Sequence, residues 1–124
     1  MKYHIIFLSM LSASIGCNNL DSNKLVGEWQ AYYISEGDTP LEIDYSEVGF
    51  LFKEDGFYSY ESTINYKEAG TYYVNGSLLY TMDTVNTASN EKAVQIEALS
   101  ADSLILKMKA NGEIKIMKLR KVGQ

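Results

Sequence analysis

Short runs of apolar residues alternate with polar positions along most of this chain, and turn residues separate the runs about every ten residues. From Leu25 onward the runs are rich in Tyr, Phe, Val, Ile and Thr, and none has the period of an amphipathic helix. The pattern predicts eight strands, near Leu25–Ser35, Glu47–Lys53, Phe57–Ile64, Gly70–Asn75, Ser77–Asp83, Ala93–Leu99, Ser103–Lys109 and Ile114–Lys121. We therefore expect an all-β domain.

The connections between these runs favour antiparallel hairpins. Glu54–Gly56, Asn75-Gly76 and Asn111-Gly112 supply residues that adopt positive φ in tight turns. Glu36–Ser46 and Thr84–Lys92 are longer and polar, as surface loops are, and the first is long enough for a short helix or a lid.

Alternation assigns one face of each strand to a shared interior. The residues expected to point inward are Trp29, Tyr33, Phe50, Phe52, Tyr58, Tyr60, Tyr72, Val74, Leu78, Tyr80, Met82, Val94, Ile96, Leu104, Leu106, Met108, Ile114 and Ile116. Those expected to face solvent are Glu28, Gln30, Thr71, Thr81, Gln95, Glu97 and Lys107. Eight such strands avoid free edges by closing into an up-and-down antiparallel barrel. Because the inward residues are bulky, we expect the barrel to be filled or nearly filled.

The first 16 residues have the pattern of an export signal. Lys2 and His4 form a polar start, and Ile5–Ala13 is an apolar run that is too short to cross a bilayer as a stable helix. Small residues then lead to Cys17, the only cysteine. An unpaired cysteine is unusual in an exported protein, because oxidising compartments favour paired thiols.

Ser14-Ile15-Gly16-Cys17 resembles the lipobox of bacterial lipoproteins. The resemblance implies cleavage after Gly16 and lipidation of Cys17. The polar run that follows indicates a tether over residues 17–24, and the strand pattern places the barrel domain over residues 25–124. The alternatives are an ordinary signal followed by an unmodified cysteine, or an N-terminal helix with a core thiol. Asn18 and Asn19 resemble the residues that direct lipoproteins to the outer membrane, which implies a lipid-anchored location in the cell envelope, on the periplasmic face.

The formal net charge of −5 argues against nucleic acid as a partner, since phosphates reward clustered basic charge. The basic residues gather only near the C-terminus, between Lys115 and Lys121, where they alternate with apolar residues. This pattern favours a strand with a solvated basic face over a binding patch. The expected membrane contact is therefore through the N-terminal acyl chains.

The mature chain lacks the usual side chains of several catalytic classes. The only histidine, His4, lies in the expected signal, and the thiol of Cys17 is expected to be acylated. Histidine-based triads, Cys–His nucleophiles and common zinc sites are thereby excluded. A carboxylate pair such as Glu61 and Asp83 could serve a glycosidase only if the two groups faced each other across a cleft, and solvated surface carboxylates are the favoured interpretation. We expect no catalytic residues, no cofactor and no metal site.

Leu25-Val26-Gly27-Glu28-Trp29 contains a Gly-x-Trp sequence that opens the first predicted strand. Together with Phe52–Tyr58, Gly70–Val74 and Leu99–Leu106, it resembles the lipocalin superfamily and the lipocalin-like domains of lipoproteins from Bacteroides-type bacteria. The resemblance implies a lipocalin-like barrel, with the indole plugging one end of its core. It also implies, more weakly, small-molecule binding.

Tyrosine is the one unusual enrichment, with ten residues. Tyrosines either form a binding surface or fill the core with hydroxyls at the rim. The candidate ligand-binding residues are Trp29, Tyr33, Phe52, Tyr60, Tyr72 and Tyr80. Two functions remain open: binding of a small apolar or amphipathic ligand, or a filled barrel that acts as an accessory subunit in an envelope assembly. A continuous interior pocket of about 300 Å3 or more, lined by Tyr33, Phe52, Tyr60 and Tyr80, would favour ligand binding. A packed interior with an exposed aromatic patch would favour a partner protein.

Overall fold

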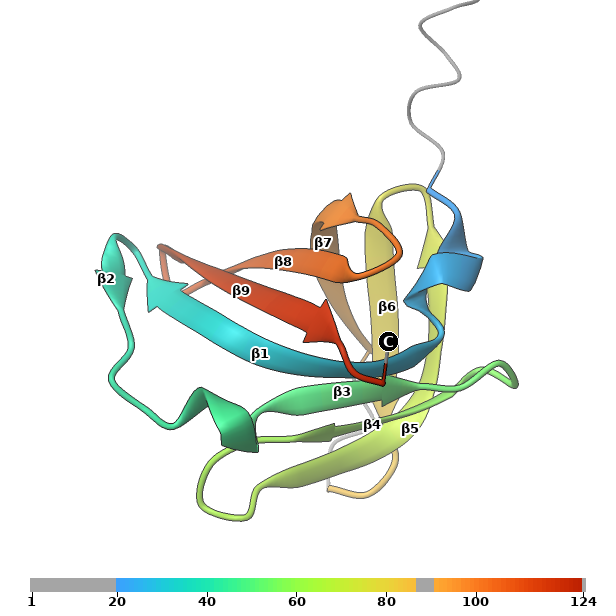
Figure 1. Ribbon diagram of the computed structural model, residues 1–124, viewed down its shortest axis with the longest axis horizontal. Coiled ribbons are helices and arrows are strands. Elements are labelled where there is room, and N and C mark those ends of the chain that lie inside the picture. Colours follow the sequence, from blue (N-terminus) through green and yellow to red (C-terminus); the bar gives the residue numbers. More distant parts are fainter. Residues whose placement is uncertain (1–19, 87–90, 124) are drawn as a thin grey trace, which may run out of the picture.

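The computed structural model describes residues 20–86 and 91–123, and they form an all-β structure (Figure 1). Its strands are β1 (Gly27–Glu36), β2 (Thr39–Pro40), β3 (Gly49–Phe52), β4 (Phe57–Glu61), β5 (Lys67–Asn75), β6 (Leu78–Asp83), β7 (Glu91–Leu99), β8 (Ser103–Ala110) and β9 (Glu113–Lys121). Two 3-10 helices, η3 (Ser22–Leu25) and η4 (Tyr45–Glu47), precede β1 and β3. Within these residues no helix is long and apolar enough to cross a membrane.

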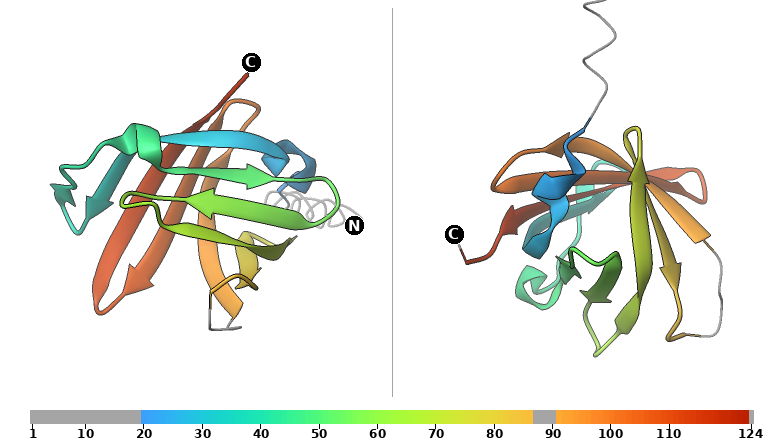
Figure 2. Two further views of the ribbon diagram at one scale, coloured as in Figure 1. Left: turned by 90° about the horizontal axis from the view of Figure 1, so that it is seen from below. Right: turned by 90° about the vertical axis from the view of Figure 1, so that its right-hand side faces the viewer.

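The strands form one antiparallel sheet that closes on itself (Figure 2). Neighbours in sequence pair with one another from β3 to β9, β1 pairs with β3, and β9 returns to pair with β1. The two-residue strand β2 pairs only with the end of β1, through Ser35–Pro40 and Glu36–Thr39. The predicted closed eight-strand antiparallel barrel is therefore confirmed, with β2 as a small addition in the long connection after β1.

One end of the barrel is closed by Trp29 and by the residues just before β1. Trp29 is 1% exposed, and its indole Nε1 donates a hydrogen bond of 2.8 Å to the carbonyl oxygen of Leu25 in η3. The ammonium of Lys121 lies 4.7 Å from the centre of the Trp29 ring and donates to the carbonyl of Val26. Phe52 and Leu25 are also fully buried. The expected indole plug is thus present, and we name this the closed end.

Gly70 marks the closest approach of two strands. A Cβ at this position would lie 1.8 Å from the carbonyl oxygen of Met82 on the neighbouring strand β6. That separation is far below van der Waals contact, so only glycine permits β5 and β6 to pair here with Gly70 opposite Asp83.

The predicted inward faces are wrong in three places. On β6 the buried residues are Leu79, Thr81 and Asp83, whereas Leu78, Tyr80 and Met82 face outward. The cause is the register with β5, which sets Leu79 opposite the inward Val74, and paired residues share a face.

On β9 the register with β8 has the same effect. Met117 and Leu119 lie opposite Leu106 and Leu104 and are buried, whereas Ile114 and Ile116 belong to the outer face. On β1 a register shift between Ala31 and Tyr33 moves Tyr33 outward and Ile34 inward.

The expected signal, residues 1–16, and the lipidation site Cys17 lie outside the described residues. Part of the expected tether is folded, since Asp21 caps η3 through its side chain and Leu20 packs against the core.

Candidate functional site

A small cavity of about 120 Å3 occupies the barrel interior away from the Trp29 plug. The residues that line it come from seven strands and are Phe50, Tyr60, Glu68, Leu79, Thr81, Lys92, Val94, Leu106, Met108 and Met117. Most are apolar, and several lie at strand ends that face the longer connections after β1, β4 and β6. The cavity therefore lies toward the end of the barrel opposite the plug, which we name the open end.

Aromatic side chains fill the space between the cavity and the plug. Phe50 stacks on Phe52 with ring centres 5.1 Å apart, and Tyr60 lies 4.5 Å from Phe50. Tyr72 meets the edge of Phe52 at 5.0 Å. These packed rings occupy much of the interior beside the cavity. The barrel is therefore nearly filled, as expected from its bulky inward residues.

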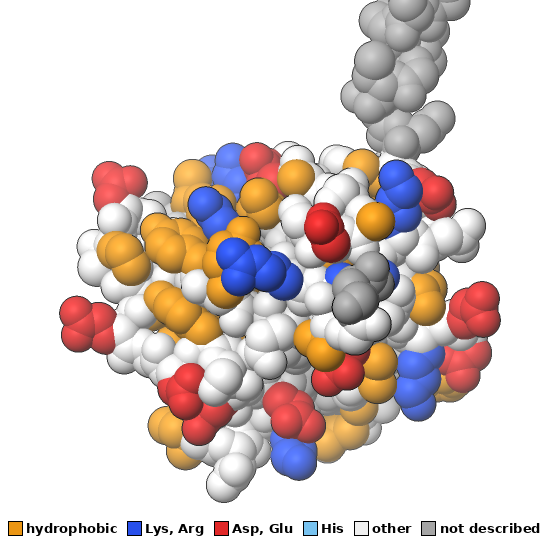
Figure 3. Space-filling view, in the orientation of Figure 1, with side chains coloured by type: hydrophobic (Ala, Val, Ile, Leu, Met, Phe, Trp, Pro, Cys, Tyr) orange, Lys and Arg blue, Asp and Glu red, His pale blue; other side chains and the backbone are white. Residues whose placement is uncertain are grey.

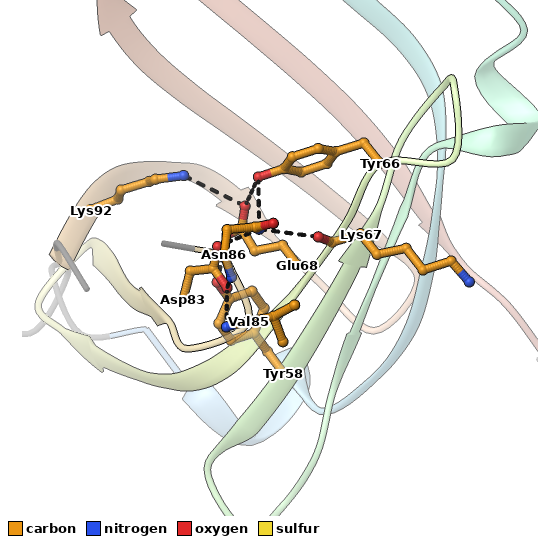
Figure 4. Close-up of polar contacts among 8 residues, drawn as sticks. All are labelled: Tyr58, Tyr66, Lys67, Glu68, Asp83, Val85, Asn86 and Lys92. Carbon is orange, nitrogen blue, oxygen red and sulfur yellow. Dashed lines mark hydrogen bonds and ion pairs between the residues drawn. The ribbon is translucent and has the colours of Figure 1, made fainter. Parts of the chain in front are cut away.

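Glu68 is a buried carboxylate in the cavity wall (Figure 4). Its Oε2 accepts a hydrogen bond of 2.5 Å from the hydroxyl of Tyr58, and its Oε1 accepts one of 2.8 Å from Tyr66. The ammonium of Lys92, on β7, lies 3.5 Å from Oε1. Both carboxylate oxygens are thus satisfied, and the pair of opposite charges makes this wall polar without leaving a buried unpaired charge.

Asp83 supports the same region from β6. Its Oδ1 accepts hydrogen bonds from the backbone amides of Val85 and Asn86, and its Oδ2 accepts one of 2.6 Å from the Asn86 side chain. The Asn86 amide group also donates to the carbonyl of Lys67, across to β5. Burial raises the pKa of Asp83, but these hydrogen bonds outweigh it and hold the pKa below its ordinary value. The carboxylate therefore fixes the start of the β6–β7 connection beside Glu68 (Figure 4).

The tyrosines that hold Glu68 have raised pKa values. Burial, followed by the hydrogen bond and the charge of Glu68, raises the pKa of Tyr58 far above its ordinary value. For Tyr66 the hydrogen bond to Glu68 is the main cause, and it raises the pKa to about 12. Ionising either phenol would place a second negative charge beside Glu68, so both are donors at neutral pH.

Replacing Glu68 with glutamine is expected to lower the pKa of Tyr66 toward the ordinary value of about 10. A raised folded-state pKa means that the Tyr66 contribution to stability is full below about pH 10 and is lost as the pH rises toward 12. Glu68→Gln should remove most of this dependence. Phenolate absorbance during an alkaline titration measures the change, with Tyr66→Phe as the control that identifies the Tyr66 step. An unchanged titration in Glu68→Gln would contradict the assignment.

Of the six predicted ligand-binding residues, the structure places only Tyr60 in the cavity wall. Trp29 and Phe52 are buried near the closed end, and Tyr72 packs on Phe52 while its hydroxyl donates to the carbonyl of Lys53. These three residues belong to the packed core.

Tyr33 and Tyr80 were expected to point inward and do not. Tyr33 lies beneath the ammonium of Lys118 at 5.0 Å, on the outer side of β1. Tyr80 packs edge-on against the half-exposed Tyr73 at 4.8 Å, on the outer side of β5 and β6. Both corrections follow from the strand registers described above.

The structure does not bring Glu61 and Asp83 to a common cleft. Glu61 is exposed on the outside of β4, where it lies 3.9 Å from Lys67, whereas Asp83 is buried and fixed by Asn86. Within residues 20–86 and 91–123, no group of three potential metal-ligating His, Cys, Asp or Glu side chains occurs.

Sequence reasoning missed Glu68 and Lys92 as site residues. The predicted strands began at Gly70 and Ala93, whereas β5 and β7 begin at Lys67 and Glu91. Continuing the alternation of Tyr72 and Val74 backward would have placed Glu68 on the inward face.

The closed antiparallel barrel and its small internal cavity define a β-barrel with a candidate binding interior. A sequence profile of the lipocalin-like domain family matches residues 25–106. The chain belongs to this family, which confirms the resemblance seen in the sequence.

Two solved structures have the same fold. A lipocalin-like protein from Bacteroides uniformis is 20% identical, with a TM-score of 0.61 over 79% of this chain and 98% of that one. An uncharacterized protein from Bacteroides eggerthii is 14% identical, with a TM-score of 0.57 over 77% of this chain and 98% of that one. A comparison with curated proteins gives no match. At these identities the structural likeness concerns the fold alone.

Proposed function

We propose that this protein is a lipid-anchored binding protein of the bacterial cell envelope, whose barrel receives the apolar end of a small amphipathic molecule. The observation that carries the proposal is the cavity at the open end, with apolar walls and one polar side formed by Glu68 and Lys92. Such a combination of apolar surface and a few placed polar groups is typical of small-molecule sites.

The cavity size limits what can enter. Its volume of about 120 Å3 is close to that of an engineered apolar cavity of about 150 Å3 that binds benzene. It is well below the volume of about 300 Å3 or more that encloses a drug-sized ligand. The interior therefore suits one ring or a chain of about six carbon atoms, while the remainder of the ligand stays at the mouth.

The charges at the wall favour an acidic head group. Glu68 already accepts from two tyrosines, whereas the Lys92 side chain is 58% exposed and touches Glu68 on one side only. Its ammonium is therefore available to a second anion at the mouth. A short carboxylic acid would place its tail among Val94, Leu106 and Met117 and its carboxylate near Lys92.

The anchor and the location rest on the sequence. The segment Ser14–Cys17 resembles a lipobox, and we propose that acyl chains on Cys17 attach the barrel to the outer membrane, on its periplasmic face. In this proposal the protein acts by binding rather than by catalysis.

A second candidate function is that of an accessory subunit in an envelope assembly. The cavity of about 120 Å3 falls short of the volume of about 300 Å3 that would favour an enclosed ligand, and this supports the second candidate. The outward aromatic pair Tyr73 and Tyr80 and the half-exposed Phe57 support it as well. The first candidate therefore applies only to a molecule whose apolar end alone enters the barrel. Exposed aromatic side chains of this kind are enriched at protein interfaces.

Filling the cavity should abolish ligand binding. Hexanoate is the probe, and saturable chemical-shift changes of cavity residues in the full chain measure its affinity. Val94→Phe places a ring in the cavity and is expected to weaken binding at least tenfold, because the tail loses its space. Val85→Phe is the matched control, since Val85 is 61% exposed and does not line the cavity.

Lys92→Met is the second variant, because the exposed Lys92 head can be removed without repacking the core. This variant should lower the affinity for hexanoate but leave the affinity for hexanol unchanged. A wild-type protein that binds neither probe, or a folded Val94→Phe that binds as well as wild type, would refute the ligand proposal and leave the accessory subunit as the better candidate.

A further inference from the structure

The outer face of β8 and β9 carries a regular arrangement of charge. Lys107 and Lys109 on β8, and Lys118 and Arg120 on β9, alternate with the inward residues of these strands. Register sets Lys118 opposite Ile105, Lys107 opposite Ile116 and Lys109 opposite Ile114, while Arg120 lies opposite Ser103. The four cations and three isoleucines therefore form a checkerboard, which we name the basic face.

Two tyrosines of β1 extend the basic face across the β1–β9 pairing. The guanidinium of Arg120 lies 4.0 Å from the centre of the Tyr32 ring, and the ammonium of Lys118 lies 5.0 Å from that of Tyr33. Cation–π contacts hold these charged ends against the sheet without neutralising them. The face thus presents its charge and its apolar surface together.

The net charge of the basic face is positive, whereas that of the whole chain is negative. The protein has a net charge of −5, yet the acid that pairs with a cation of the basic face is Glu97, 3.9 Å from Lys107. In the described residues Lys109, Lys118 and Arg120 form no ion pair. Figure 3 shows Lys and Arg beside hydrophobic side chains over β8 and β9, with an acidic side chain next to them.

A groove lies along the edge of the basic face. It has a volume of about 440 Å3, and its lining residues are Leu78, Ala93, Gln95, Lys107, Met108, Lys109 and Ile114. Its lining combines apolar side chains with two lysines, Lys107 and Lys109, and this combination matches the chemistry of an anionic amphiphile, in which an acyl chain adjoins a phosphate.

We propose that the basic face docks on the headgroup layer of an anionic phospholipid bilayer. Lys and Arg are attracted to the negative surface potential, and tyrosine favours the boundary between polar and apolar surroundings. Isoleucines between the cations contact the upper acyl region, as in other interfacial surfaces. This contact is distinct from the proposed acyl anchor, and its groove shares only Met108 with the lining of the cavity. It turns one fixed side of the barrel toward the membrane.

The test uses the full chain with Cys17→Ser, so that no acyl chain contributes to binding. Co-sedimentation is measured with vesicles of phosphatidylcholine alone and of phosphatidylcholine mixed with phosphatidylglycerol. We expect binding to the anionic vesicles only, with a decrease as salt is raised. Lys118→Glu combined with Arg120→Glu should lower this binding at least tenfold.

The matched control is Lys53→Glu combined with Lys67→Glu, which changes the net charge equally at exposed positions outside the basic face. It should retain binding within about threefold of the starting protein. Circular dichroism verifies that both double variants keep their β structure. Equal binding to both vesicle types, equal losses in the two double variants, or no binding to anionic vesicles would each overturn the proposal. In the last case an acidic protein becomes the alternative occupant.

Discussion

Trp29→Ala should lower the free energy of unfolding by about 3–5 kcal/mol. Trp29 is 1% exposed, so truncation leaves a large cavity at the closed end. It also leaves the buried carbonyl of Leu25 without its donor, and it removes the ring that lies under the Lys121 ammonium. Urea unfolding followed by circular dichroism measures the loss. Because small domains have a stability of about 5–15 kcal/mol, the variant will be near the limit of folding.

Trp29→Phe separates the contribution of ring packing from that of the hydrogen bond to Leu25. The phenyl ring retains most of the packing but cannot donate to Leu25, so we expect a loss of about 1–3 kcal/mol. If Trp29→Ala cost less than about 1 kcal/mol, the indole would not be the plug of the closed end.

Cys17→Ser should move the protein out of the membrane fraction after a high-salt wash, or leave an uncut precursor. The reason is that two or three acyl chains, each methylene contributing about 0.8 kcal/mol, hold a lipoprotein essentially permanently. Without the thiol there is no acceptor for the first lipid. Fractionation and immunoblotting measure both outcomes. The salt wash removes the weaker electrostatic contact expected of the basic face.

Asn23→Ser is the matched control for the anchor, because it introduces the same residue into exposed η3, beyond the proposed lipidation site. It should remain in the membrane fraction. A Cys17→Ser protein that stays membrane-bound with its signal removed would show that the lipobox assignment is wrong.

The strands and their antiparallel order could be predicted because both are local properties. Alternating residues and turns such as Asn111-Gly112, where both residues have positive φ, determine where a hairpin forms without reference to the rest of the chain. The candidate site could be predicted less well. Tyr60 was found, but Glu68 was missed because it comes two residues before the predicted start of its strand.

The sequence by itself determined the barrel class, the indole plug and the density of the interior, since these depend on residue size and alternation. Only the tertiary structure decided which side of β6 and β9 faces inward, because a one-residue difference in register exchanges the two faces of a strand. Register also gathered Glu68 with Lys92, and the basic residues of β8 with those of β9, from positions far apart along the chain. Both proposed binding surfaces depend on strand register, which the local alternation and turn signals do not specify.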